Sequence, residues 1–483
     1  MGLLGILVAL GLLIWLAYRG WSVLLLAPLA AVLAAGLAGE PLLAHWTQTF
    51  MGSAARFIMQ FFPIFLLGAL FGKLMEDSGS VSAIATFMTM RLGTKRAVLA
   101  VVLAGALVTY GGVSLFVAFF VLAPMAHELF RVAAIPKRLM PAAIALGAST
   151  FTMSALPGTP AIQNAIPMPF FGTTPFAAPG LGVIASAIML GFGLWWLARA
   201  EASARRKGQG YGADAASGAD AADDLVVRER ATTSSTFDPA EIRHGHESVS
   251  APSIAVAVFP LVIVVGVNLL MSLFILPRLN ASYLADEAWG STSLSAVGGV
   301  WAVVTALAAA IVVLIAVNLR RLPDLRGSMD AGANASALPV LSVASLVGFG
   351  SVVAALPAFA MVRDWVLSIQ GGPLVSLAVA TNVLASLTGS ASGGLTIALD
   401  ALGDSYMRLA AEKGIDPGLM HRIAVIGAGT LDSLPHNGAV VTLLAVCGST
   451  HRESYFDIVM VSIVGGLLAL AAVIGLGTAF GSF

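Results

Sequence analysis

Charged residues are scarce in this chain. They make up 10% of its 483 residues, whereas hydrophobic residues make up 58%. Soluble domains carry roughly a quarter charged residues, so this composition excludes an ordinary soluble globular protein. Basic and acidic residues number 25 each, and this balance gives no indication of a nucleic-acid partner. The chain has one cysteine, Cys447, which lies in an apolar run where packing is its expected role.

Long apolar runs recur along the whole length. Runs of this length can cross the ~30 Å hydrocarbon core of a bilayer as helices, so the sequence predicts an all-α polytopic membrane protein. The first run lacks a basic region in front of it and is followed at once by a second, which favours a retained helix over a cleaved signal. About ten spans are expected, at Leu3–Ala17, Val23–Leu37, Ala55–Leu74, Leu139–Thr159, Gly182–Leu197, Ile254–Ile275, Ser293–Val317, Leu338–Val362, Leu419–Val446 and Ile458–Phe480.

The chain contains one pattern twice. Three segments of the first half recur in the second half in the same order: Leu139–Thr150 as Leu419–Thr430, Tyr110–Phe116 as Ser392–Ala398, and Ser154–Gly158 as Asp432–His436. Each copy runs from a glycine-interrupted apolar stretch through an apolar helix to a polar break. Paired interruptions at corresponding places in two membrane halves indicate the binding site of a secondary transporter.

Two apolar stretches, Ala97–Phe130 and Pro373–Met407, are interrupted in the middle by glycines. Their arms are short for full spans, so we expect two re-entrant hairpins. Each half then has an odd number of spans, and the two repeats are inverted. The second copy's loop, Asp404–Arg422, carries mixed charges, as an external loop can. The positive-inside rule places other loops in the cytoplasm through Arg91, Lys95, Arg96, Arg131, Lys137, Arg138, Arg205, Arg206, Lys207, Arg320, Arg321 and Arg326.

These boundaries predict three parts of the chain. Residues 1–198 form the first repeat, with scaffold spans in 1–90 and a hairpin and broken helix in 97–170; residues 199–250 form a linker; and residues 251–483 form the second repeat, with scaffold spans in 251–362, a hairpin and broken helix in 373–448 and a last span in 455–480. The linker is rich in alanine, glycine, serine and aspartate, which predicts a disordered cytoplasmic segment. It contains His244 and His246, for which a solvated linker is favoured over a metal pair.

The hairpin tips and helix breaks are the expected substrate site. Backbone that leaves the helix inside lipid must be buried in protein or line a water-filled cavity. Free N–H groups at helix N-termini attract anions, and glycines allow close approach. Every lysine and arginine maps to a span end or loop, so these groups would hold a carboxylate without a basic side chain. The candidate substrate-binding residues are Gly111, Gly112, Ser114, Thr159, Gln163, Asn164, Ser392, Gly393, Gly394, Thr396, Ser433 and Asn437. Helix packing is the other interpretation of the glycines.

Asp432 and Asp400 are the acidic residues that we place deepest in the membrane, where such groups are costly unless functional or paired. Burial favours the neutral form of a carboxylic acid, and histidine titrates near neutrality. Asp432, His436 and Asp400 are therefore candidates to carry a coupling proton. The alternatives are a water-facing Asp400 and a hydrogen-bonded core His436. Four other residues are expected to be solvated near the membrane interfaces: Glu76, Asp77, His127 and Glu128.

Three motifs, Phe71–Gly79 (FGKLMEDSG), the YGGVS tip at 110–114 and Ser433–Val440 (SLPHNGAV), resemble the gluconate permease (GntP-type) family within the ion transporter superfamily. The resemblance covers the chain except for the linker, which departs from the family's pattern. It implies a multi-pass symporter of the bacterial inner membrane that imports gluconate or a related hydroxy acid with protons. The superfamily implies a homodimer with a fixed scaffold and a moving, hairpin-bearing domain (an elevator). Leu156–Thr174 resembles members for short acids such as 3-hydroxybutyrate.

The leading prediction is thus a proton-coupled carrier of a small hydroxylated carboxylate, without a cofactor. A sodium-coupled carrier is the nearest alternative, because unwound carbonyls with serine, threonine and asparagine also coordinate Na⁺. An intramembrane enzyme would need Asp400 and Asp432 as a shared-proton pair, and no HExxH motif is present. A channel would need a continuous polar pore, and no expected span carries a sustained polar stripe.

Overall fold

The computed structural model describes residues 2–18, 21–212, 251–435 and 437–483. Every regular element in these ranges is a helix, which confirms the predicted all-α class. By length and apolar composition seven of the helices can each cross a membrane, and an eighth crossing arises if the bent pair Ser80–Leu92 and Thr94–Tyr110 counts as one. The chain is therefore a polytopic helical protein. Most of the predicted linker, with His244 and His246, lies outside the described residues, as does His436.

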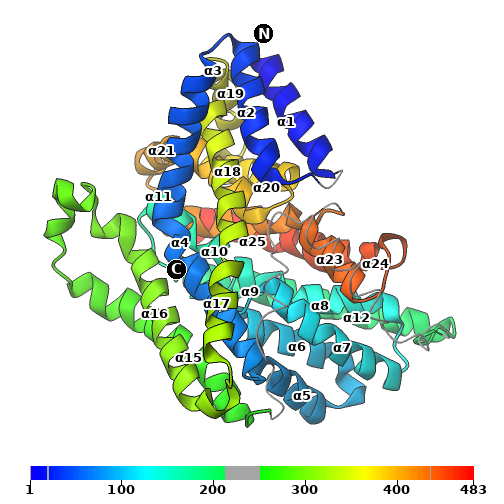
Figure 1. Cartoon of the computed structure of the whole chain (residues 1–483). Coiled ribbons are helices and arrows are strands. Elements are labelled where there is room, and N and C mark those ends of the chain that lie inside the picture. Colours follow the sequence, from blue (N-terminus) through cyan, green and yellow to red (C-terminus); the bar gives the residue numbers. More distant parts are fainter. Residues whose placement is uncertain (1, 19–20, 213–250, 436) are drawn as a thin grey trace.

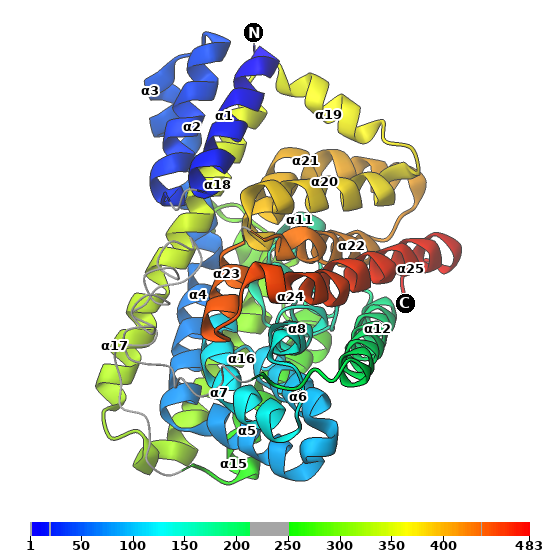
Figure 2. The ribbon, with the colours of Figure 1, turned by 90° about the vertical axis from the view of Figure 1, so that its right-hand side faces the viewer.

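Long helices form one side of the molecule (Figures 1 and 2). α4 (Met51–Asp77) continues α3 (Leu42–Ala44) and η1 (His45–Phe50) as one apolar stretch of 36 residues. This stretch is longer than the predicted span. α17 (Leu325–Ala335) and α18 (Ala337–Ala355) follow each other and pack along α4.

Two helical pairs flank the long helices α4, α17 and α18. α1 (Gly2–Tyr18) packs on α2 (Val23–Ala38), and α2 packs on α18. α15 (Ile254–Leu270) packs on α16 (Leu294–Asn318), and α16 packs on α4. Shorter elements complete this part of the chain: α5 (Ser80–Leu92), η2 (Thr94–Arg96), η5 (Met271–Ile275), η6 (Leu276–Arg278), η7 (Ser282–Ala285), η8 (Glu287–Trp289), η9 (Leu319–Arg321) and α19 (Phe359–Leu367).

Two helical hairpins lie where the sequence predicts them. α6 (Ala97–Tyr110) turns into α7 (Leu115–Val132), and α20 (Gly372–Thr388) turns into α21 (Ala391–Lys413). The arms of each hairpin pack on each other. The two turns differ in length, because four residues separate the arms of the first hairpin and Gly389 and Ser390 alone separate those of the second.

Two helices are broken at the predicted polar segments, inside the spans expected at 139–159 and 419–446. The first consists of α8 (Met140–Ala148), α9 (Phe151–Ser154), α10 (Ile162–Ala165) and α11 (Pro167–Phe171); the second consists of α22 (Pro417–Thr430), η10 (Leu431–Ser433) and α23 (Gly438–Val446). Prolines remove backbone donors and so favour such breaks. η3 (Lys137–Leu139) leads into α8, and α12 (Pro179–Arg206) follows the first broken helix. The second broken helix is followed by α24 (His451–Ile458), η11 (Val459–Val464) and α25 (Gly465–Phe480).

The expectation that Glu76 and Asp77 are solvated is wrong. Their side chains are 8% and 0% exposed, and Lys73 pairs with them at 3.2 Å and 3.0 Å. The hydroxyl of Ser328 also donates to Asp77 at 2.6 Å. This buried group joins the C-terminal end of α4 to α17. Helical spacing of three and four residues brings the opposite charges together on one face. The packing of α17 on α4 buries these three side chains.

Candidate functional site

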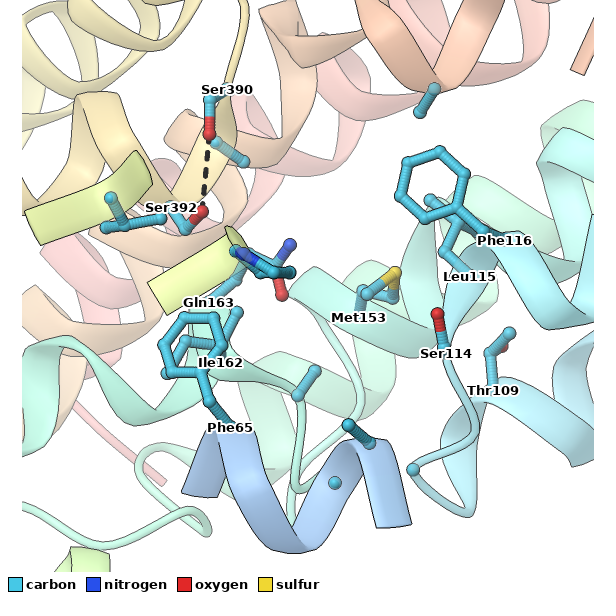
Figure 3. Close-up of a pocket in the computed structure, with 18 of the residues that line it drawn as sticks. Phe65, Thr109, Ser114, Leu115, Phe116, Met153, Ile162, Gln163, Ser390 and Ser392 are labelled. Carbon is cyan, nitrogen blue, oxygen red and sulfur yellow. Dashed lines mark hydrogen bonds between the residues drawn. The ribbon is translucent and has the colours of Figure 1, made fainter. Parts of the chain in front are cut away.

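A cavity of about 200 Å³ lies where both hairpin turns, both helix breaks and the long helices meet (Figure 3). Its walls come from parts of the chain far apart in sequence, including Phe65 of α4 and Ser336 at the α17–α18 junction. Figure 3 shows Ser114, Gln163, Ser390 and Ser392 placed around the same space. Six residues predicted from the sequence line it: Gly112, Ser114, Gln163, Ser392, Asp432 and Asn437. Ser433 instead lines a smaller neighbouring cavity of about 40 Å³, which Gln163, Asp432 and Asn437 also border.

The first hairpin turn is shaped by Gly112 and Ser114. Gly112 has a φ of +98°, and a Cβ there would lie 2.9 Å from Cγ of Pro160 in the first break. Ser114 is the residue before the first turn of α7, so the free N–H groups of that helix begin at the cavity wall. The Tyr110 hydroxyl donates to the carbonyl of Pro157 at 2.9 Å, which ties this hairpin to the first break.

The second hairpin turn is capped by Ser390. Its hydroxyl accepts from the backbone N–H of Gly393 at 3.2 Å and shares a hydrogen bond with Ser392 at 3.3 Å. Ser390 and Ser114 therefore hold the same position, immediately before the second arm of each hairpin. In the aligned segments Tyr110–Phe116 and Ser392–Ala398, Ser114 corresponds to Thr396 instead. The preference of serine for helix N-caps could have identified Ser390.

Three predicted tip glycines do not line the cavity, and a Cβ at each would press on a neighbouring residue. Gly393 and Gly394 lie inside α21, because the turn ends at Ser390. A Cβ would lie 2.4 Å from a methyl of Leu346 at Gly393, 2.2 Å from the backbone nitrogen of Ala385 at Gly394 and 2.2 Å from a methyl of Leu261 at Gly111. Thr396 is buried on α21, where its hydroxyl donates to the carbonyl of Ser392 at 2.7 Å.

Asp432 is the one ionisable side chain that lines the cavity in the described part of the chain. Asn437 donates through Nδ2 to Asp432 at 2.6 Å and to the carbonyl of Gly389 at 2.8 Å. The backbone N–H of Ala391 also donates to the Asp432 carboxyl group. The second break is thus bonded directly to the second hairpin turn, and a carboxyl group sits at this junction.

Gln163 brings an unused acceptor to the cavity. Its Oε1 atom is buried and has no hydrogen-bond partner in the described protein. A buried polar atom without a partner is unfavourable by roughly 1–3 kcal/mol. Gln163 borders both cavities, so its amide is placed to bind a polar group of a ligand.

The residues next to Gln163 form a buried polar group behind the cavity. Asn164 is fully buried and donates to the carbonyls of Thr159 and Pro175, both at 3.0 Å. Thr159 is also fully buried, and its hydroxyl accepts from the backbone N–H of Ala161 at 3.3 Å. These two predicted residues hold the shape of the first break and do not line the cavity.

Arg422 overturns the expectation that every basic residue lies at a span end or in a loop. Its side chain is 0% exposed and lies on α22, inside the protein. The expected span Leu419–Val446 and the expected loop Asp404–Arg422 both include this residue, which puts it at a span end. Asp416 caps the helix, however, by accepting from Gly418 N at 2.6 Å, and Pro417 starts it. An acidic cap followed by proline is a helix-start signal, and it places Arg422 more than one turn inside the helix.

Asp400 lies away from the cavity. It is exposed on α21, and the hydroxyl of Ser351 on α18 donates to its carboxylate. The site thus brings together Asp432 and Asn437 with both turns but leaves out Asp400. Among the described residues, no group of three or more histidine, cysteine, aspartate or glutamate side chains could hold a metal ion.

The chain is similar to known membrane transporters. Residues 1–169 match the family model of the GntP family permeases. The chain is 40% identical over 471 residues to the uncharacterized transporter YxjC of Bacillus subtilis (strain 168), with 96% of each chain covered. Its fold is similar to that of the YdaH transporter of Alcanivorax borkumensis, whose crystal structure is described as revealing an unusual topology. The TM-score is 0.53 at 15% identity, with 91% of this chain and 89% of that chain covered.

The similarity to YdaH concerns the fold alone, whereas the similarity to YxjC spans almost the whole chain at an identity that shows common family membership. Together with the helices long enough to cross a membrane, these findings make the protein a multi-pass membrane transporter. The chain belongs to the GntP permease family.

Proposed function

We propose that this transporter takes up a small hydroxylated carboxylate together with protons across the bacterial inner membrane. One observation carries the proposal: a cavity between two hairpin turns is lined, among the described residues, by neutral hydrogen-bonding groups and one carboxyl group, that of Asp432. The direction of two helices supports an anionic substrate. α7 and α21 both begin at the cavity, at Ser114 and Ser390, and helix N-termini favour anions.

The size and lining of the cavity favour a short hydroxy acid. At about 200 Å³ it is smaller than the roughly 300–1,000 Å³ typical of sites for drug-sized ligands. This favours the 3-hydroxybutyrate class over the longer gluconate. The unpaired Oε1 of Gln163 accepts from the substrate hydroxyl, while Ser114 and Ser392 donate to its carboxylate. Ser433 and Asn437 support the same wall of the site.

The coupling ion in this proposal is the proton, carried by Asp432. Its carboxyl group links the second break to the second turn, so its protonation state acts on both. His436 lies outside the described residues, and its predicted part in proton coupling stays a prediction. A sodium ion is the alternative, because the carbonyl of Gly389 and the serines of the turn are oxygen ligands near the same carboxylate. Asp400 lies outside this site, and we assign it no role.

Two inverted repeats explain the order of the helices. In both halves a helical pair is followed by a long helix, a short helix, a hairpin, a broken helix and a final helix. In the proposed division, 1–198 and 251–483 are the repeats and 199–250 is a cytoplasmic linker. The scaffold comprises 1–90 and 251–362. The hairpins and broken helices, 97–170 and 373–448, move as the transport domain of an elevator, and the scaffolds of two copies form a homodimer.

Counterflow into proteoliposomes tests the substrate class. Vesicles with the purified protein are loaded with unlabelled acid, and transient entry of labelled 3-hydroxybutyrate is followed. We expect counterflow with 3-hydroxybutyrate and weaker counterflow with gluconate. Counterflow with neither acid, in vesicles where the protein is folded, would contradict the proposal.

A further inference from the structure

Arg422 carries a positive charge inside the protein without a carboxylate beside it. Its guanidinium donates to the carbonyl of Ala177 from Nε at 3.2 Å and from Nη2 at 2.7 Å. Its Nη1 donates to Oδ1 of Asn164 at 3.3 Å and to the carbonyl of Ser154 at 3.5 Å. All of these partners are neutral oxygens. Arginine remains protonated in proteins, so this site holds a full, unneutralised charge.

The guanidinium lies directly behind the cavity wall. Its partners Ser154 and Asn164 are the chain neighbours of Met153 and Gln163, and both Met153 and Gln163 line the cavity. Arg422 itself does not line the cavity. A charge in a low-dielectric interior acts over longer distances than in water. The cavity therefore lies close to the fixed positive charge of Arg422, although its lining in the described residues contains no basic side chain and one carboxyl group, that of Asp432.

Few other charges face this arrangement. Around Arg422 the titratable neighbours are His421 on the same helix, which bonds Thr173 and Asn164, and Tyr110 of α6. Around Asp432, α24 contributes Tyr455, which donates to the carbonyl of Ser433, and His451, which bonds the carbonyl of Pro435. α20, η11 and α25, which pack on these two segments, contain no charged residue. α21 also packs on α22, and its charged residues are all exposed: Asp400, Asp404, Arg408, Glu412 and Lys413. His436 lies outside the described residues. α4 carries a separate ion-paired group, Lys73, Glu76 and Asp77, none of which lines the cavity.

We propose that Arg422 is the fixed positive charge that makes the cavity select a carboxylate and that couples each monoanion to one proton on Asp432. This inference rests on the proposed function. In the empty site the positive charge of Arg422 balances an ionised Asp432. When a monoanion binds, Asp432 takes up a proton from the same side, and the substrate carboxylate replaces its charge. The proton and the anion leave together on the other side, so the site is neutral in both states and crosses the membrane without moving net charge.

Arg422 acts through Asn164 and the first break, so it is a positioning and selectivity residue. Its test needs a readout that a purely structural role would not change. Inhibition of labelled 3-hydroxybutyrate uptake is measured with two probes, unlabelled 3-hydroxybutyrate and its neutral amide, 3-hydroxybutyramide. The inhibition constant of the amide divided by that of the acid reports selectivity for the charge. This ratio is independent of how much protein is active.

We expect Arg422→Gln to reduce this ratio by about tenfold or more, because a charge-assisted interaction is lost. Arg422→Lys keeps the charge and should retain most of the ratio. Arg408→Gln is the matched control: it removes an exposed arginine from the neighbouring helix α21, and its ratio should equal that of the unaltered protein. An unchanged ratio in Arg422→Gln would show that the residue only holds the break together and would overturn the proposal.

A second measurement uses the unaltered protein, because Arg422→Gln also removes hydrogen bonds on which folding depends. Proteoliposomes receive either a pH gradient or a potassium diffusion potential set with valinomycin at equal pH. One-to-one coupling predicts accumulation with the pH gradient and none with the potential alone. Accumulation driven by an inside-negative potential would overturn the charge balance while leaving proton-coupled uptake standing. Absence of uptake in every gradient would instead contradict the proposed function, and this inference with it.

Discussion

At the scale of single residues, Asp432 is held where a change in its charge has structural consequences. Asn437 donates to it at 2.6 Å and bonds Gly389 at the same time, and the backbone N–H of Ala391 supplies a second donor. These donors belong to the second turn and the second break. An ionised and a neutral carboxyl group bind such donors with different strength. The protonation of Asp432 therefore controls how firmly the turn is held against the break.

We expect Asp432→Asn to abolish accumulation driven by a pH gradient while sparing exchange of substrate. The amide has almost the same shape and cannot carry the proton. Uptake under a pH gradient and counterflow at equal pH measure the two activities separately. Asp400→Asn is the matched comparison, since that residue is exposed and lies away from the cavity. Normal accumulation in Asp432→Asn together with its loss in Asp400→Asn would reverse the assignment.

Gln163→Leu should raise the KM for the hydroxy acid roughly fivefold, because about 1 kcal/mol of hydrogen bonding to the substrate is lost. The unpaired Oε1 of Gln163 has no protein partner to lose, so folding stability should be unchanged or slightly higher. Initial uptake rates over a range of concentrations, together with a thermal unfolding curve, measure both effects. A lowered unfolding temperature with an unaltered KM would assign Gln163 a structural role.

Which residues could be found from the sequence depended on whether local pattern or tertiary packing places them. Asp432 and Asn437 follow from the proline-containing break itself, and Ser114 follows from its glycine pair. Arg422 falls at the end of an expected span, and its burial follows from tertiary packing, although Asp416 and Pro417 mark a helix start before it.

At the scale of helices, the two hairpins use glycine differently. Gly112 sits in the first turn with a positive φ and contacts Pro160 of the break. Gly394 lies inside α21 and lets α20 approach its backbone. The double glycines look alike in sequence. Only the packing of α20 on α21 distinguishes a turn glycine from a contact glycine, so the sequence predicts Gly393 and Gly394 at the second tip whereas the turn consists of Gly389 and Ser390.

Substitution by alanine should separate these two roles. Gly112→Ala should remove most transport and leave the protein folded, because a Cβ strains the turn and presses on Pro160. Gly394→Ala should lower stability by about 1–3 kcal/mol, because the added atom meets backbone that cannot move aside. Gly191→Ala on α12, where a Cβ would meet nothing within 4 Å, is the control. Thermal unfolding and uptake distinguish them, and a stable, active Gly394→Ala protein would contradict the packing role.

At the scale of the whole molecule, the long helices and the hairpins form two groups that meet at the cavity (Figure 2). α4 touches the first turn closely: a Cβ at Gly72 would lie 3.3 Å from the nitrogen and 3.8 Å from Cβ of Ser114. Residues of α4 and of the α17–α18 junction complete the cavity, and no local pattern in the sequence could have indicated them. If the hairpins move against the long helices, this contact must open in each transport cycle.

A disulfide across this contact should stop transport. The separation of 3.8 Å between the Cβ positions of residues 72 and 114 matches that of a typical disulfide, about 3.8 Å. Because Ser114 is a proposed substrate donor, the single variant Ser114→Cys sets the baseline rate of uptake. The double variant Gly72→Cys with Ser114→Cys should lose this remaining uptake on oxidation and regain it on reduction. The single variant Ser114→Cys, treated in the same way, shows whether oxidation acts without the cross-link. Full activity of the oxidised, cross-linked protein would show that α4 and the first hairpin do not separate.

The central claim is that protons drive uptake of a small hydroxy acid through the site of Asp432. Uptake of labelled 3-hydroxybutyrate into proteoliposomes, with an inward pH gradient compared with an inward sodium gradient at equal pH, tests it most directly. We predict accumulation with the pH gradient, in the absence of sodium, and no accumulation with the sodium gradient. Accumulation that requires sodium would contradict the claim and would move the ion site to the carbonyls and hydroxyls of the second turn.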